Sequence, residues 1–187
     1  MSDGSRRIRL LALPALAATT LALAATVAAE PVTGGKTVLV PNQETFEALS
    51  DMGIEITTTG GAKFGGKGAK FTVTGGIVGE AGKDTIEHKG GLLFSRDEDG
   101  AVKVSNFTAV LGEKKGKLFA KSGGAQFAFL KLDLSEAEQS GVPGSISIEG
   151  AEASLTKQSA AVFSEAFAAE FRRGVPVGEL NIEAQFG

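Results

Sequence analysis

Glycine is the feature that most constrains how this chain can fold. The 187 residues include 26 glycines, which cluster between short segments where apolar and polar residues alternate. Alternation with a period of two is typical of strands, and glycine clusters between such segments are typical of tight turns. The sequence therefore predicts about eight to ten short strands joined by turns.

Two segments depart from that period and predict helices. Residues 41–52 place Phe46 and Leu49 on one side, behind Asn42 as the candidate N-cap. Residues 156–173 begin with Thr156 as the candidate cap and carry a stripe at helical spacing, formed by Ala160, Phe163, Phe167 and Phe171. We expect a mostly β fold, either a strand-rich sandwich or a partly closed barrel. Its short N-terminal helix would be joined by one amphipathic helix near the C-terminus, which would cover a face or an open end.

The first 29 residues have the pattern of a secretory signal peptide. Arginines at positions 6, 7 and 9 precede an apolar stretch, and Val27-Ala28-Ala29 puts small residues before the expected cut at Glu30. The alternative is a retained membrane anchor, which the short, alanine-rich stretch disfavours. We expect a signal peptide over 1–29, a linker over 30–36 and one β-rich domain over 37–187. The product would be secreted or held in the cell envelope, with no transmembrane segment after cleavage.

Charge and composition exclude several classes of partner. Cleavage removes three of 19 basic and one of 22 acidic residues, which leaves 16 and 21 and a net charge of −5. Such a surface disfavours nucleic acid and anionic lipid. The chain has no cysteine, so no disulfide supports the fold, but the 158 residues of the predicted mature chain are enough to bury a core.

His88 is the only histidine, in a chain with 12 phenylalanines and no tyrosine or tryptophan. On an unbroken strand it would face the same side as Ile86, Gly90, Leu92 and Phe94. His88 is therefore either a metal or haem ligand at the mouth of an apolar pocket, or a strand-end histidine held by hydrogen bonds. One histidine without cysteine is a poor metal-binding set. The phenylalanine stripe of the late helix, in the same way, either lines a ligand cavity or docks the helix on its sheet.

No motif indicates catalysis. Residues 61–68 nearly spell a phosphate-binding loop, but Gly68 stands where the serine or threonine that meets magnesium should be, so a hairpin loop is the interpretation. No G-x-S-x-G nucleophile motif occurs. We predict that the protein is not an enzyme.

Two segments of the chain resemble the HtaA-type domain of haem-transport-associated surface proteins of actinobacteria. Residues 82–92, GKDTIEHKGGL, look like the strand of that family with an apolar residue, a histidine, a glycine and a leucine. Leu155-Thr156, followed by Ala160-Ala161-Val162-Phe163, looks like its closing helix. The resemblance covers about residues 37–187, which is nearly the whole predicted mature chain.

The resemblance implies an exported, strand-rich domain that takes up haem, with the iron held by a tyrosine and assisted by the histidine that matches His88. This chain has no tyrosine, and Phe46 stands on the early helix that should offer the ligand. We therefore expect a non-catalytic binding domain of the envelope for haem or another apolar planar ligand. Its expected site residues are His88, Phe46, Phe94, Phe163 and Phe167, with His88 as the candidate iron ligand. The alternative is a structural or adhesion module that contacts an envelope protein and has no small ligand.

Overall fold

The computed structural model describes residues 29–79, 83–97 and 100–187. The predicted signal peptide lies outside the described residues, apart from Ala29. Within those ranges, neither helix is long and apolar enough to cross a membrane.

Eight antiparallel strands form a closed barrel. They are β1 (Glu30–Pro41), β4 (Gly68–Val78), β5 (Asp84–Lys89), β7 (Gly100–Leu111), β8 (Lys115–Ser122), β9 (Ala125–Asp133), β11 (Ser145–Leu155) and β12 (Pro176–Phe186). Their order around the barrel is β7-β5-β4-β1-β12-β11-β9-β8, and the pairing of β8 with β7 closes the ring. The fold is thus the expected strand-rich one, and the barrel is fully closed rather than partly closed.

Four further strands extend this barrel. β2 (Glu55–Thr59) and β6 (Gly91–Arg96) continue the sheet beyond β7, β3 (Lys63–Gly65) forms a hairpin with β4, and β10 (Glu138–Val142) pairs with β11. The first half of β7 pairs with β6, and its second half pairs with β5 and β8. The change of partner occurs at Asn106, which has a left-handed φ of 51° and lies at a register shift. β7 therefore leaves the barrel at this bulge and carries β6 and β2 with it.

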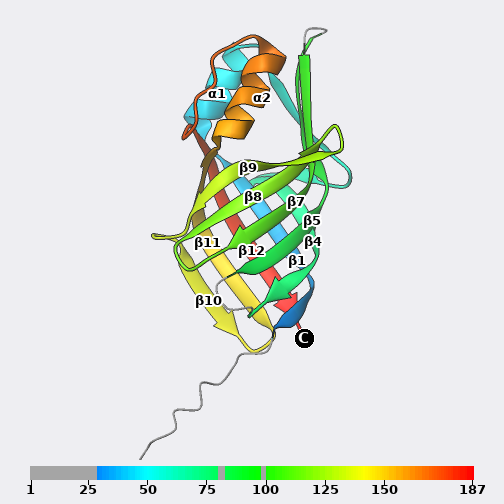
Figure 1. The fold of residues 1–187 in the computed structure, drawn as a ribbon, viewed down its shortest axis with the longest axis vertical. Coiled ribbons are helices and arrows are strands. Elements are labelled where there is room, and N and C mark those ends of the chain that lie inside the picture. The colour runs from blue at the N-terminus through cyan, green and yellow to red at the C-terminus, as the bar shows by residue number, and fades with distance from the viewer. Residues whose placement is uncertain (1–28, 80–82, 98–99) are drawn as a thin grey trace, which may run out of the picture.

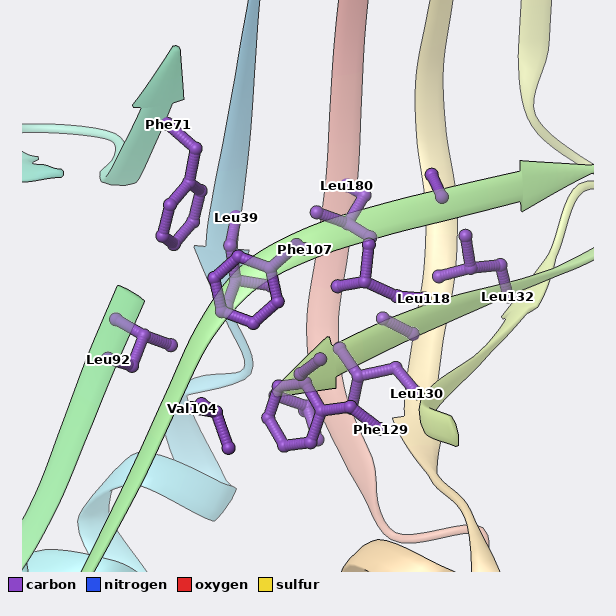
Figure 2. Packing of buried hydrophobic residues seen from close by; sticks show 14 of the residues in the cluster. Leu39, Phe71, Leu92, Val104, Phe107, Leu118, Phe129, Leu130, Leu132 and Leu180 are labelled. Atoms are coloured by element: carbon purple, nitrogen blue, oxygen red, sulfur yellow. The ribbon is translucent and has the colours of Figure 1, made fainter. Parts of the chain in front are cut away.

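Side chains fill the interior of the barrel. Buried residues alternate along the strands, as Leu180, Ile182 and Ala184 do on β12. Figure 2 shows the labelled leucine and phenylalanine side chains of different strands turned toward one another. An eight-stranded barrel is just wide enough for its side chains to fill it. The cavity that these side chains and His88 line measures only about 10 Å³, which is too small for a ligand.

Both helices lie at one end of the barrel, and the C-terminus lies at the other (Figure 1). α1 (Gln43–Asp51) begins at the predicted cap, where the side chain of Asn42 accepts a 3.0 Å bond from the amide of Thr45. α2 (Lys157–Phe167) begins at the predicted Thr156, which forms a capping box with Ser159. The buried hydroxyl of Ser159 also donates to the Phe129 carbonyl on β9 at 2.7 Å, which fixes the start of α2 over that strand.

Three segment predictions were wrong. Residues 30–36, predicted as a linker, belong to β1 and pair with β4 and β12. Gly34 and Gly35 hide the alternation there, and Gly35 has a φ of 136° at a place where a side chain would clash with the Glu183 carbonyl. Residues 135–144, predicted as a loop, contain β10, whose side chains are all exposed and so show no apolar alternation.

The third concerns the late helix, which ends at Phe167 and not at Arg173 as predicted. Ala168 takes a left-handed conformation with a φ of 47° and stops the helix. The Ser164 hydroxyl then accepts a 2.9 Å bond from the amide of Phe171, which folds the following segment back along α2.

Gly90, between β5 and β6, offers a test of how the extension is built. It has a φ of 109°, and a Cβ there would lie 2.9 Å from the Cβ of Ala62 and 3.0 Å from its amide nitrogen. We expect Gly90→Ala to lower the free energy of unfolding by about 3 kcal/mol, measured by urea denaturation followed by circular dichroism. The matched control is Gly66→Ala at an open turn, where no atom lies within 4 Å. It should change stability by less than about 0.5 kcal/mol. Equal losses in the two variants would contradict this view of Gly90.

Candidate functional site

An apolar groove of about 360 Å³, which we call the aromatic groove, lies at the helical end of the barrel. One wall is α1, another is the segment that follows α2, and the floor consists of residues from β6, β9, β11 and α2. This volume is within the range of small-molecule sites, although near its lower end. The lining residues are Glu44, Thr45, Phe46, Ala48, Leu49, Met52, Phe94, Phe129, Leu155, Phe163, Glu170, Phe171, Arg172, Val175, Pro176 and Val177.

The floor of this groove is built around Phe163 of α2. Its ring lies edge-on to Phe94 at a centroid distance of 4.8 Å, stacks with Phe129 at 6.3 Å and lies 5.5 Å from Phe171. Edge-to-face and offset-stacked rings are the arrangements that aromatic pairs favour. Phe94, Phe129 and Phe163 are only 4 %, 1 % and 3 % exposed, so they form the packed base of the floor. Phe171, in the segment after α2, is half-buried.

Charged groups stand at the edge of the groove. The Nε of Arg172 donates to Oε1 of Glu170 at 2.8 Å, and both side chains are exposed. That hydrogen bond, together with the charge of Arg172, lowers the pKa of Glu170, so the carboxylate is ionised at neutral pH. The third charged residue of the lining is Glu44, in the first turn of α1. The groove is therefore apolar inside and charged at its rim.

A second, wider groove of about 1020 Å³ lies between α1, β2 and the β3–β4 hairpin. Phe46 lines both grooves, whereas Ala48 lines only the aromatic groove and Ser50 only the second one. The two faces of α1 can thus be probed separately.

His88 does not reach the aromatic groove. It lies inside the barrel with 4 % of its surface exposed, and it lines the small central cavity. Its Nδ1 lies 3.2 Å from the Phe107 carbonyl, and its Nε2 lies 2.7 Å from the Thr37 hydroxyl. A carbonyl only accepts, so Nδ1 carries the proton and, in the neutral ring, Nε2 accepts from Thr37. The structure thus matches the interpretation of a histidine held by hydrogen bonds.

Phe129 separates His88 from the groove, since its ring lines both the groove and the central cavity. This ring is 1 % exposed and stacks on Phe107, whose carbonyl binds His88. Any ligand in the groove therefore meets Phe129 and not the imidazole.

The predicted site residues divide into two groups. Phe46, Phe94 and Phe163 come together at the groove. Phe167 is fully buried behind them, 5.9 Å from Phe163 and beneath the guanidinium of Arg96, and His88 lies in the barrel.

Sequence reasoning missed Met52 and Phe129 as lining residues, and it placed Phe171 on the helix rather than on the segment after it. A signal for Phe129 was present in residues 125–134, which have apolar residues at both odd and even positions, so that both faces of the strand are expected to be covered. A register shift in β9 there buries Phe129 and Leu130 side by side. Nothing in the sequence pointed to Met52, at the end of α1.

Comparison with known proteins gives a family for this chain. The HtaA family model, described as Htaa, matches residues 50–172, which is more than half of the sequence. The chain belongs to the HtaA family. No curated protein sequence matches it.

Solved structures share the fold of this HtaA-family chain. The C-terminal domain of HtaA from Corynebacterium glutamicum has a TM-score of 0.69 at 17 % identity, over 84 % of this chain and 99 % of that one. The N-terminal domain of the same protein has a TM-score of 0.60 at 15 % identity, over 83 % and 98 %. The heme-binding protein HtaB of that organism has a TM-score of 0.54 at 13 % identity, over 86 % and 96 %.

Haem is the group that the HtaA family implies, and the residues of the groove can be compared with those that hold haem iron in other proteins. The side chains that hold haem iron in proteins are histidine, cysteine, methionine and tyrosine. This chain has no cysteine or tyrosine, and both nitrogens of its one histidine are bonded inside the barrel. Met52 is the one sulfur at the groove, and methionine serves haem beside a histidine, which the groove lining lacks. The donor set does not fit a protein-ligated iron.

Burial of His88 predicts acid sensitivity. Desolvation lowers its pKa from 6.5 to about 4, although the bond to the Phe107 carbonyl opposes the shift. The unfolded chain binds a proton below pH 6.5, whereas the folded protein does so only near pH 4. Stability due to the neutral ring is therefore complete above pH 6.5 and is lost as the pH falls from 6.5 to 4.

We expect this loss to reach about 3 kcal/mol, from the size of the shift. Urea denaturation at several pH values should show it in the native protein, and His88→Gln should have a shallower dependence, because glutamine does not titrate. Identical pH dependences in the two proteins would contradict the burial of a neutral ring.

Proposed function

We propose that this protein is an exported, non-catalytic binding domain of the cell envelope that holds a planar apolar ligand, haem foremost, in the aromatic groove. The observation that carries the proposal is the convergence of Phe94, Phe129, Phe163 and Phe171 on one open groove. Membership of the HtaA family and the fold shared with a heme-binding protein support haem as the ligand. The signal-peptide pattern of residues 1–29 supports export.

The half-buried rings of Phe46 and Phe171 at the groove favour a binding domain over a purely structural module. A module without a ligand would use Phe46, Phe94 and Phe163 to fill a closed interior. All three line the groove, but Phe94 and Phe163 are only 4 % and 3 % exposed and belong to the packed core, whereas Phe46 is half-buried. Apolar side chains left at an open groove are typical of a site that a ligand completes.

A hydrolase would need His88 beside a nucleophile in an open cleft. The Thr37 hydroxyl does lie 2.7 Å from Nε2, but Thr37 is only 2 % exposed and His88 only 4 %. The cavity that they line is about 10 Å³, too small for a substrate. The geometry therefore supports binding.

A charge placed in the groove tests the site. Ala48 is exposed on α1 and lines the aromatic groove, so Ala48→Glu should fold normally and force a carboxylate under the ligand. Because an ionised group loses its water there, we expect haem to bind at least about tenfold more weakly. Absorbance titration of the purified protein with ferric haem measures the change.

Ser50→Glu is the matched control, since it adds the same charge to an exposed position of the same helix and lines only the second groove. It should leave haem affinity within about twofold. If Ser50→Glu weakened binding and Ala48→Glu did not, the ligand would occupy the second groove; if haem did not bind the native protein, the proposal would fail.

A further inference from the structure

We infer that the groove recognises the porphyrin ring and not its iron, so that metal-free protoporphyrin binds as tightly as haem. This inference rests on the proposed function, because it concerns the ligand of the same groove. It follows from two features of the groove: its side chains can contact a porphyrin ring and its carboxylates, and none of them is a suitable ligand for the iron.

The one imidazole of the chain, His88, is hydrogen-bonded to Thr37 and Phe107 inside the barrel. To reach a ligand in the groove, His88 would have to give up its 2.7 Å bond to Thr37 and displace the ring of Phe129. The Thr37 hydroxyl, 2 % exposed, would then lose its partner inside the barrel. A buried hydroxyl left unpaired is costly, so the closed arrangement opposes ligation by His88.

The remaining donors at the groove are poor partners for ferric iron. Met52 offers a thioether, a soft ligand that suits soft metals, and it stands at the end of α1 with 38 % of its surface exposed to water. Glu170 is held by Arg172 at 2.8 Å, and Glu44 is exposed in the first turn of α1. No groove residue thus supplies a buried donor aimed at the centre of a macrocycle.

The contacts that the groove does provide are the same for both porphyrins. The half-buried rings of Phe46 and Phe171 can contact an aromatic face whether or not a metal sits at its centre. Arg172 uses its Nε for Glu170, and among the described residues no further hydrogen bond occupies its two terminal nitrogens. Those nitrogens suit the carboxylates that both porphyrins carry. The affinity should therefore come from the ring and its acid groups.

The direct test compares the two ligands on the purified native protein. Protoporphyrin affinity is measured by the fluorescence of the porphyrin itself. Ferric haem is then titrated in as a competitor. We expect dissociation constants within about threefold of each other. Haem affinity more than about tenfold above that of protoporphyrin would overturn the inference and leave the proposed function intact.

Two variants sharpen the comparison. Met52→Leu conserves volume and removes the sulfur, so it should leave the haem-to-protoporphyrin ratio and the absorbance of bound haem unchanged; a selective loss of haem affinity would identify Met52 as an iron ligand and overturn the inference. Ala48→Glu should weaken both porphyrins equally. If neither porphyrin binds the native protein, the proposed function and the inference fail together, a result distinct from unequal affinities.

Discussion

Closure of the barrel by the pairing of β7 with β8 is the constraint on which the rest of the structure depends. Eight strands leave an interior that side chains fill, and here they leave a cavity of only about 10 Å³. The barrel can therefore act as a rigid support but not as a container. The apolar groove that α1 and the segment after α2 line lies outside it, at the helical end.

The groove exists because β7 is longer than the barrel needs. At Asn106 it bends out of the ring, and Gly90 lets the neighbouring chain turn with it from β5 into β6. Phe94 on β6 then meets Phe163 on α2 above the barrel mouth. The same bulge places the Phe107 carbonyl against His88, so the distortion that shapes the groove also helps to seal the imidazole in the core.

Local features of the sequence predicted local structure well. Asn42 and Thr156 cap their helices as expected, because a capping bond depends only on residues three positions away. The alternating positions from Ile86 to Phe94 are buried as expected, but the strand is not unbroken. It divides at Gly90 into β5 and β6, so His88 lies inside the barrel and Phe94 at the groove. The prediction failed where pairing partners decide the structure. β10 is held by β11 without apolar residues of its own, and the glycines at 34 and 35 look like a linker until β12 lies beside them.

The site was predicted in part for the same reason. Strand parity with His88 led to Phe94, the helical stripe led to Phe163 and the family resemblance led to Phe46, and the structure places all three at one groove. The environment of His88 depended on Thr37 and Phe107, which are 51 and 19 residues away and belong to other strands. Strand parity gives the direction in which a side chain points, but only the closed barrel shows that this direction leads to a packed interior.

The measurement that most directly tests the separation of imidazole and groove is an NMR pH titration of the His88 ring, with and without protoporphyrin. The chain has one histidine, so the signal is unambiguous. A ring sealed behind Phe129 stays neutral until the pH approaches its pKa of about 4, and its midpoint does not move when the porphyrin is added. A midpoint near the ordinary value of 6.5, or one that shifts when the groove is filled, would show that the imidazole is open to water or to the ligand and would contradict the structure described above.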